Sequence, residues 1–352
     1  MNNIKKLIDK LEYEHSLTLE EYLALVEGFS DDALNYIAPK ALKAKQSVYG
    51  DDIYIRGLIE ISNICKNNCN YCGIRAGNTK CDRYRLTEDE ILSCCKEGYR
   101  LGFRTFVLQG GEDGYYTDDV VCSVVAKIKE LYPKCAVTLS LGERSFESYK
   151  RLFDAGADRY LLRHETIDKE HYNMLHPESM NYENRIKCLY NLKEIGYQIG
   201  CGFMVGSPYQ TTLNIAKDLK FIEEFKPHMC GIGPFIPHKD TEYARYEAGS
   251  ASLTCYLLAI IRLIKPNILL PATTALATIA EDGRTKGILC GANVVMPNLS
   301  PKKDRAKYSL YDNKAFLNTE AAEGLKELKA NLNKIGAKIV TKKGDIKNDG
   351  NI

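Results

Sequence analysis

Residues 61–86 of the chain read ISNICKNNCNYCGIRAGNTKCDRYRL. This stretch contains Cys65, Cys69 and Cys72, spaced as C-x3-C-x2-C. Three thiolates on one short loop are able to bind three irons of a cubane cluster, whereas ferredoxins close every iron with cysteine. The fourth iron is then open to a small molecule that supplies a nitrogen and an oxygen together. The spacing therefore predicts a cluster with one iron free to bind a second ligand.

A structural zinc site is the main alternative for these cysteines, and a closed cluster is another. Zinc takes four ligands, usually as two close pairs, but these three are tightly spaced and no histidine follows nearby. Cys81 is the candidate for a fourth ligand. Tyr71 stands where an aromatic ring would lie against a bound ligand, and Gly73 lets the backbone pass close to the sulfur atoms.

The cysteine loop resembles the signature of the radical S-adenosylmethionine (SAM) enzymes. The resemblance implies that the open iron chelates the amino and carboxylate groups of SAM. It also implies that an electron from the cluster cleaves SAM to a 5′-deoxyadenosyl radical. The cofactors expected on this basis are one 4Fe-4S cluster and SAM.

Composition describes an ordinary globular chain. It has 352 residues, 45% of them hydrophobic, and a formal charge of +2, which gives no argument for nucleic acid or an acidic surface as partner. The cysteines are 13 in number and scattered, which favours reduced thiols in the cytoplasm over a disulfide framework. The start is polar, unlike a signal peptide. The longest apolar stretch, residues 253–264, contains Arg262 and is too short to span a membrane.

Strand-like and helical patterns alternate from residue 52 onward. The predicted strands are residues 53–61, 105–109, 136–141, 158–163, 198–205, 229–234, 268–272 and 292–296. The predicted helices between them include residues 87–101, 117–131, 145–155, 182–195, 211–225 and 252–264. This order predicts an α/β fold, a (β/α)8 TIM barrel over residues 51–336, with a doubly wound open sheet as the alternative. Residues 1–50 are expected to form a helical cap on the barrel, and residues 337–352 a loose polar tail.

Polar side chains mark the carboxyl ends of the predicted strands, where barrel enzymes place their chemistry. Arg163 and Glu165 share one face of the fourth strand. They are suited to the carboxylate and ammonium of an amino-acid-like ligand, and an internal ion pair is the equal alternative. His164 faces the other way and is expected to pack. The glycines of QGGED, residues 109–113, allow the chain to approach a ligand closely. The GIGPF stretch, residues 231–235, is either an adenine-binding edge or a tight turn.

Several motifs extend the resemblance beyond the superfamily. ICKNNCNYCGIR, RYRLT, VLQGGED, VTLSLGE, DRYLLRHET, CGIGPFIPH, PATTA and CGANVVMPN occur in this order over residues 64–298. Together they closely resemble the HydE family of FeFe-hydrogenase maturases, with methylornithine synthase and biotin synthase as nearby relatives that share the barrel. By this resemblance Cys65, Cys69 and Cys72 are the cluster ligands. The implied SAM site is Tyr71, Gln109, Gly110, Gly111, Glu165, Arg185, Met204 and Ile232. The implied substrate site is Arg56, Thr138, Arg163, Thr273, Thr274, Met296, Tyr308 and Tyr311.

The resemblance also implies a substrate and partners. The substrate would be a small anionic iron complex carrying cysteinate, CO and cyanide, made by another hydrogenase maturase and attacked at the cysteinate sulfur. The product would be an iron unit of the di-iron subcluster, and a ferredoxin or flavodoxin would donate electrons. The alternatives are a methylornithine synthase-like or biotin synthase-like enzyme acting on an amino-acid-like substrate, and a non-enzymatic iron–sulfur carrier or scaffold. A carrier is disfavoured because it needs no deep polar pocket.

The sequence departs from this family at two places. Some members carry a second cluster on three cysteines in the C-terminal region, but no cysteine follows Cys290 here, so we expect no second cluster. Gly110 replaces the family's serine after the glutamine of the second-strand motif. The resemblance therefore implies one hydroxyl contact fewer at this position.

Overall fold

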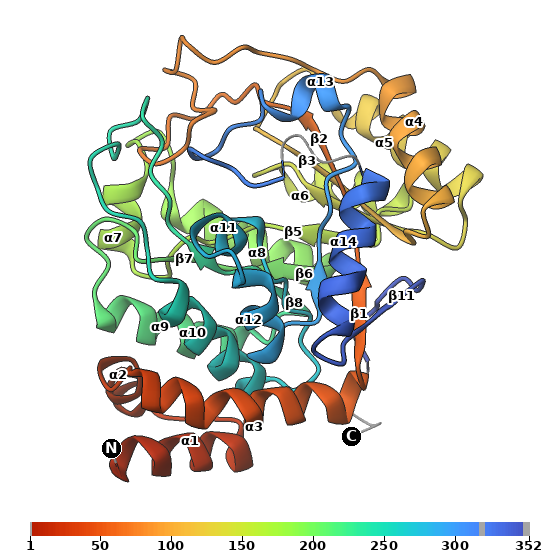
Figure 1. The fold of residues 1–352 in the computed structure, drawn as a ribbon. Coiled ribbons are helices and arrows are strands. Elements are labelled where there is room, and N and C mark those ends of the chain that lie inside the picture. The colour runs from red at the N-terminus through yellow and green to blue at the C-terminus, as the bar shows by residue number, and fades with distance from the viewer. Residues whose placement is uncertain (1, 317–320, 348–352) are drawn as a thin grey trace.

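The computed structural model describes residues 2–316 and 321–347. Three helices, α1 (Asn2–Glu14), α2 (Leu19–Glu27) and α3 (Asp31–Tyr49), lie together along one side of the body (Figure 1). They pack on α9 (Thr212–Phe225) and α10 (Ala251–Ile264). The N-terminal helices therefore cover the outer faces of two helices of the main body.

The centre of the fold is a parallel sheet of six strands, in the order β2-β3-β4-β5-β6-β8. These strands are β2 (Gly57–Ser62), β3 (Thr105–Gly110), β4 (Ala136–Ser140), β5 (Arg159–Leu161), β6 (Gln198–Cys201) and β8 (Met229–Cys230). Neighbours along the chain are neighbours in the sheet, and a helix follows most strands. This arrangement confirms the predicted α/β class, since parallel neighbours need crossover connections.

Parallel pairing continues beyond both edges of this sheet. On one side β1 (Asp52–Ile55), which leads directly into β2, pairs with β10 (Val294–Val295). On the other side Met229 of β8 forms a bridge with Leu269, and Pro271 forms one with Val294. A separate pair, β7 (Met204–Val205) and β9 (Gly233–Pro234), extends the lines of β6 and β8.

Several predicted strands are shorter or more broken than the sequence pattern indicated. The first is divided at Arg56, and the seventh, residues 268–272, forms isolated bridges only. The fifth and sixth are each divided in two. Gly202, with φ +154°, explains these last two breaks, because a Cβ there would lie 2.1 Å from the carbonyl oxygen of Gly231. The two strands approach too closely at this point for a regular ladder.

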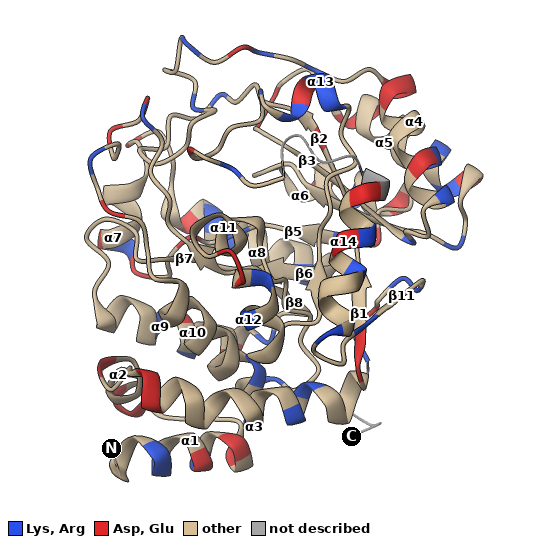
Figure 2. Ribbon diagram, viewed as in Figure 1, with Lys and Arg blue, Asp and Glu red and all other residues tan. Residues whose placement is uncertain are grey.

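All six predicted helices are present, and each begins after a side-chain cap at Thr87, Thr117, Ser145, Asn181, Thr211 or Ser250. They are α4 (Glu88–Arg100), α5 (Asp118–Leu131), α6 (Phe146–Asp154), α8 (Tyr182–Ile195), α9 and α10. The additional helices are α7 (Lys169–Leu175), α11 (Thr274–Ile279), α12 (Gly283–Leu289), α13 (Lys302–Arg305) and α14 (Ala321–Asn333). Charges of both signs are interspersed along the helices (Figure 2).

The C-terminal residues differ from their prediction. Residues Lys338–Val340 form β11, which pairs in parallel with β1. The chain then continues to residue 347 along the start of the sheet (Figure 1). The expected loose tail is therefore wrong for residues 338–347, because Val340 and Ile346 pack against a buried apolar cluster that includes Tyr54. Residues 348–352 lie outside the described residues.

No helix in the described ranges is both long and apolar enough to cross a membrane. The apolar helix α10 is instead buried inside the protein. Its Arg262 is fully buried and donates to the carbonyl oxygens of Pro266, Ile268 and Gly291 and to the side-chain oxygen of Asn293. A buried arginine of this kind satisfies four acceptors at once, at donor–acceptor distances of 2.6–3.1 Å.

The Glu223 carboxylate links the N-terminal helical segment to α9 by hydrogen bonds. Glu223 of α9 accepts hydrogen bonds from Tyr22 Oη at 2.6 Å, Ser16 Oγ at 2.8 Å and the Leu17 amide at 3.2 Å, and pairs with Lys220. Burial works to raise the pKa of Glu223, but the hydrogen bonds from Lys220, Tyr22, Ser16 and Leu17 lower it below its ordinary value. The stabilisation is present above the unfolded-state pKa and is lost as pH falls through the lowered folded-state pKa.

We therefore expect Glu223→Gln to destabilise the protein by about 1–3 kcal/mol at neutral pH, because several donors lose a charged acceptor. Thermal unfolding followed by circular dichroism measures the effect. The neighbouring Glu224→Gln is the matched control, since the Glu224 side chain is 66% exposed. Equal stability of the two variants would show that Glu223 does not fasten the helices.

Candidate active site

A cavity of about 330 Å³ lies at the carboxyl ends of the strands. Cys65, Cys69 and Cys72, on the loop that follows β2, all line it. Side chains from the ends of β3, β5 and β7 line the same space. The three thiols predicted to bind a cluster are thus brought together with the polar strand ends, and none of them is in a disulfide.

The sulfur atoms lie in a largely buried environment. Burial raises the pKa of Cys65, and raises that of Cys72 to about 12. The amides of Asn67 and Glu112 each donate to Cys65 Sγ at 3.4 Å. Buried thiols of this kind favour the neutral form unless a cation holds them as thiolates, and hydrogen bonds to a cluster sulfur tune its potential.

Arg83 and two glycines fix the shape of the cysteine loop, which has little regular structure. Arg83 donates to the carbonyl oxygens of Asn63, Ile74, Arg75 and Asn78 at 2.5–3.1 Å. This one guanidinium therefore satisfies four carbonyl groups of the loop, as buried backbone groups require.

The two glycines stand where the loop touches other parts of the chain. A Cβ on Gly73 would lie 2.2 Å from the carbonyl oxygen of Ser309, and one on Gly111 would lie 2.3 Å from that of Ile64. The second glycine of QGGED therefore serves to seat the β3 end against the cysteine loop. Both Gly110 and Gly111 also line the cavity, so the predicted approach to a ligand remains possible there.

The donor set fits an iron–sulfur cluster better than a single metal ion. In the described part of the chain no group of three His, Cys, Asp or Glu side chains converges as the ligands of one ion would. A cubane cluster does not need such convergence, because each cysteine binds a different iron. Cys65, Cys69 and Cys72 would hold that cluster, and Cys81 does not line the cavity.

Several polar side-chain atoms in the cavity lack a well-directed hydrogen bond within the protein. Arg163 Nη2 lies 3.1 Å from Glu165 Oε2, as the sequence alternation suggested. Yet these two atoms and Arg163 Nε are buried without a well-directed hydrogen bond. Glu165 also has a positive φ of 65°, a conformation that costs a non-glycine residue energy and is typical of functional positions. The unsatisfied atoms fit the amino and carboxylate groups of SAM or of a substrate.

Arg185 reaches the cavity from α8 and is held by a carboxylate. Its Nε lies 2.7 Å from Glu143 Oε1. Burial disfavours the charge of Arg185, but Glu143, with smaller effects from Tyr172 and Glu112, raises its pKa above the ordinary value. Arg185 therefore remains a cation beside the ligand space.

Tyr71 and Tyr308 also line the cavity, and a polar contact holds each of them. Tyr71 Oη lies 3.2 Å from His176 Nε2, and the two rings meet edge to face at 5.5 Å. Burial lowers the pKa of His176 to about 3, so the imidazole is neutral at physiological pH. Gln109 Nε2 donates to Tyr308 Oη at 3.2 Å. Both tyrosine rings are thus fixed by polar contacts while they line the cavity.

Most residues implied for the site line this one cavity. They are Cys65, Cys69, Tyr71, Cys72, Gln109, Gly110, Gly111, Arg163, Glu165, Arg185, Met204, Thr273, Met296, Tyr308 and Tyr311. Arg56 and Thr138 instead line a smaller space of about 30 Å³, which shares Leu161, Gly231, Pro271 and Met296 with the large cavity. Ile232 is buried and lines neither space, although Gly231 and Gly233 beside it face the large one.

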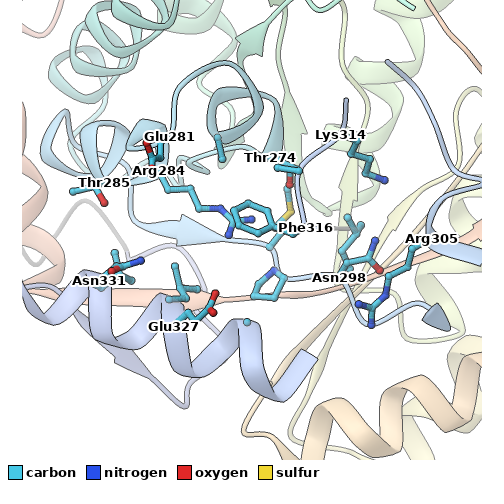
Figure 3. Close-up of a pocket in the computed structure, with 18 residues that line it drawn as sticks. Thr274, Glu281, Arg284, Thr285, Asn298, Arg305, Lys314, Phe316, Glu327 and Asn331 are labelled. Atoms are coloured by element: carbon cyan, nitrogen blue, oxygen red, sulfur yellow. The ribbon is translucent and has the colours of Figure 1, made fainter. Parts of the chain in front are cut away.

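Thr274 lies in a different place. It begins α11, whose N-cap is Thr273, and it lines a separate cavity of about 150 Å³ with Arg284, Lys314 and Glu327 (Figure 3). The start of a helix turns successive residues apart, which separates Thr273 from Thr274. Glu112, which lines the large cavity, and Glu143, which pairs with Arg185, were not among the predicted site residues. They stand in the motifs VLQGGED and VTLSLGE.

Comparisons with known proteins agree with this geometry. The Radical SAM superfamily model matches residues 59–222. The chain is 43% identical, over 88% of each sequence, to the [FeFe] hydrogenase maturase subunit HydE of Thermotoga maritima. It is 29% identical, over 83% of each sequence, to 3-methylornithine synthase of Methanosarcina acetivorans.

Two solved structures are similar to this chain in fold. Crystal structures of methylornithine synthase (PylB) and of the [FeFe]-hydrogenase maturase HydG superpose with TM-scores of 0.81 and 0.79, covering 95% and 96% of this chain and 97% and 76% of theirs. Sequence identities are 24% and 22%.

The parallel sheet and the three-cysteine cavity at its carboxyl edge define a radical SAM enzyme. Enzymes of this class use a 4Fe-4S cluster and SAM, and the residues of this cavity fit both. Within that class the chain belongs to the HydE family.

Changing Cys65, Cys69 or Cys72 to Ser should each remove the visible absorption of the reconstituted cluster, because a hydroxyl does not replace a thiolate at iron. Cys81→Ser is the matched control on the same loop, and it should keep the absorption and the iron content. Loss of the cluster in Cys81→Ser would mean that the fourth iron is closed by protein.

Arg185→Ala should weaken SAM binding by about one to two decades, the effect of losing one charge-assisted hydrogen bond. Equilibrium binding to the cluster-loaded protein measures it. Lys187→Ala, two residues along α8 on its exposed side, is the control and should bind SAM normally. Unchanged affinity in Arg185→Ala would exclude this residue from the SAM site.

Proposed function

We propose that this enzyme acts in maturation of FeFe-hydrogenase, on a small anionic iron complex that carries cysteinate, CO and cyanide. The observation that carries the proposal is the identity of 43% to HydE over 88% of both chains. The cavity supports it, because cluster cysteines and unsatisfied polar groups share one enclosed space. We further propose that the strand pairings and bridges close into a (β/α)8 barrel around this space, between an N-terminal helical extension (residues 1–50) and the C-terminal segment.

When bound, the cluster and SAM supply a 5′-deoxyadenosyl radical. The chain's own residues bind, orient and exclude water. Cys65, Cys69 and Cys72 would ligate the cluster, while Arg185 and Glu165 would hold the polar end of SAM. Tyr71 and Met204 would pack against SAM, and Gln109, Gly110 and Gly111 would approach it with their backbone. Ile232, buried between two cavity-lining glycines, would act indirectly by positioning that edge.

The substrate is proposed to lie deeper than SAM, between Arg163 and the tyrosines. Arg163 supplies a cation whose Nε and Nη2 atoms are buried without a well-directed hydrogen bond, although the side chain as a whole is partly exposed. A carboxylate or anionic complex held away from water needs such a partner. Thr273, Met296, Tyr308 and Tyr311 would form the surrounding wall. Apolar neighbours such as Leu161 and Phe235 limit water near a reactive radical.

Arg56 and Thr138 would extend the substrate site at its deep end. Thr138 Oγ1 and Arg56 Nε are both buried without a hydrogen-bond partner, and both residues line the smaller space. Thr274 is proposed to have no direct contact with substrate, since it lines the separate cavity with Arg284.

A second candidate is an amino-acid mutase of the methylornithine synthase kind. The Arg163–Glu165 arrangement favours it, because one side chain matches a carboxylate and the other an ammonium. Formation of methylornithine from lysine by the native protein would establish this alternative in place of the maturase. An iron–sulfur carrier is separated from both by incubation of the reduced protein with SAM, since only an enzyme forms 5′-deoxyadenosine.

Arg163→Ala should keep the cluster and bind SAM normally but lose productive turnover by about a hundredfold or more, because the anionic substrate loses its cationic partner. The assay is activation of apo-hydrogenase in the presence of the other maturases and a ferredoxin or flavodoxin as electron donor. Arg151→Ala, on the exposed face of α6, is the control. Full maturation activity of Arg163→Ala would contradict the substrate assignment.

A further inference from the structure

The C-terminal residues 338–347, here called the C-terminal strap, cross the beginning of the parallel sheet. β11 pairs with β1, and the following residues contact the starts of three further strands. Thr105 of β3 donates to the Lys343 carbonyl oxygen at 2.8 Å, and the Ile346 amide donates to Gln198 of β6 at 3.3 Å. Farther along, Asn267 donates to the Lys347 carbonyl oxygen at 2.7 Å. The strap thus covers the edge opposite the cysteine loop.

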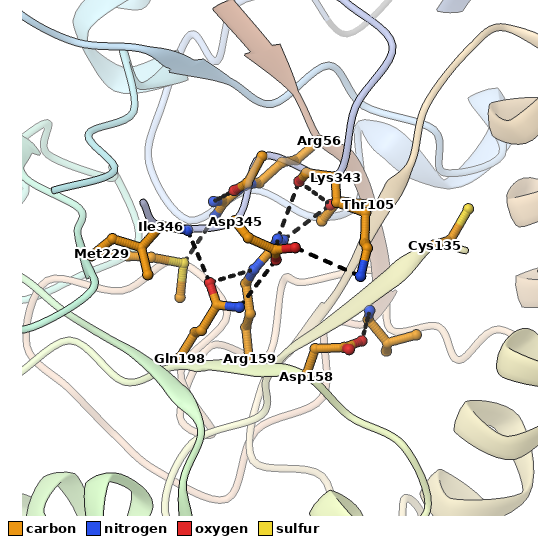
Figure 4. Close-up of polar contacts among 12 residues, drawn as sticks. Arg56, Thr105, Cys135, Asp158, Arg159, Gln198, Met229, Lys343, Asp345 and Ile346 are labelled. Carbon is orange, nitrogen blue, oxygen red and sulfur yellow. Dashed lines mark hydrogen bonds and ion pairs between the residues drawn. The ribbon is translucent and has the colours of Figure 1, made fainter. Parts of the chain in front are cut away.

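Asp345 lies at the centre of the polar contacts between the C-terminal strap and the strand starts (Figure 4). Its Oδ1 accepts from Arg159 Nη2 at 2.5 Å and from Gln198 Nε2 at 3.0 Å. The Arg159 side chain is completely buried, and it also donates to Thr105 Oγ1 at 3.0 Å and to the Lys343 carbonyl oxygen at 3.1 Å. Asp345 is therefore the carboxylate that neutralises a buried guanidinium at the start of β5.

Arg56 links this network to the deep end of the substrate cavity. Its Nη2 donates to the Gly344 carbonyl oxygen at 3.4 Å, and its Nη1 contacts Met229 Sδ at 2.9 Å. In the described ranges no carboxylate forms an ion pair with Arg56, although the residue is only 5% exposed. Its charge is thus left available to an anion on the cavity side, with the strap directly behind it.

The backbone of the strap is closely packed at Gly344, the residue that accepts a hydrogen bond from Arg56. Gly344 has φ +65°, and a Cβ there would lie 2.5 Å from the ring of Tyr54. Val340 and Ile346 pack in one apolar cluster with Met229 and Met296, which also line the small deep space. The strap is therefore packed against residues that shape the cavity itself.

We propose that the C-terminal strap is the floor of the substrate chamber, and that Asp345 is a positioning residue that holds Arg56 ready for the anionic substrate by neutralising Arg159. This inference rests on the proposed function for the identity of the substrate. Without Asp345, two buried guanidinium groups would share one region with no carboxylate between them. The strap would separate from the sheet, and Arg56 would turn toward water instead of the cavity.

The test compares Asp345→Asn with the double variant Arg159→Gln, Asp345→Asn in the cluster-loaded full chain. The substrate probe is a synthetic iron(II) complex carrying cysteinate, CO and cyanide. In Asp345→Asn the KM for this complex should rise about tenfold while the KM for SAM does not change. The double variant removes both charges and should recover most of the loss, because the buried Arg159 position then no longer carries a charge without a partner. Lys342→Gln, on the exposed side of the strap, is the control.

Hydrogen exchange followed by mass spectrometry gives a second readout that needs no turnover. Peptides that contain Lys343–Lys347 should exchange faster in Asp345→Asn than in the native protein, and peptides of the cysteine loop should not. Native exchange together with a native KM in Asp345→Asn would overturn the proposal, and so would equal losses for SAM and the complex. If the native protein does not convert the complex at all, the proposed function fails, while the exchange result still decides whether Asp345 holds the floor.

Discussion

The site depends on a loop whose shape is imposed by its neighbours. Residues between β2 and α4 carry all three cluster cysteines but form few backbone hydrogen bonds of a regular kind. Arg83 satisfies four of the loop's carbonyl groups, and the absence of a side chain at Gly111 lets the end of β3 press against Ile64 and Cys65. These contacts direct the three thiols into one cavity. Contacts that hold the loop in this shape lower the cost of ordering it around a ligand.

The residues that line the cavity fall into groups with different proposed roles. The cysteine loop, Arg185 and Glu165 line the large cavity, and we propose that they hold the cluster and SAM. Arg163, Tyr308 and Tyr311 line the same cavity, and Arg56 lines the smaller space beside it. Cations therefore stand in both spaces. An anionic substrate gains from each of them, because a buried negative charge is stable only when it is paired.

The sequence predicted those features that depend on local spacing. The α/β class followed from alternating patterns and Ser or Thr helix caps. The C-x3-C-x2-C spacing identified three cysteines that all line one cavity, and their binding of a cluster stays a prediction. Features that depend on contacts between distant residues were not accessible. The mostly polar residues of the strap predict a loose tail, yet Asp345 binds Arg159, which lies 186 positions away. Thr273 and Thr274 looked equivalent until the start of α11 separated them. The roles of Arg83 and Glu143 likewise depend on partners that no spacing rule identifies.

We propose that three cysteines hold a cubane cluster whose fourth iron is open to SAM. Electron–nuclear double resonance of the reduced protein, with SAM carrying nitrogen-15 at its amino group, tests this open iron most directly. We expect a hyperfine coupling between the cluster and the labelled nitrogen. We expect the same coupling in Cys81→Ser, because that thiol is not a proposed ligand. Absence of the coupling in protein shown to have both cluster and SAM bound would contradict the open iron and with it this description of the site.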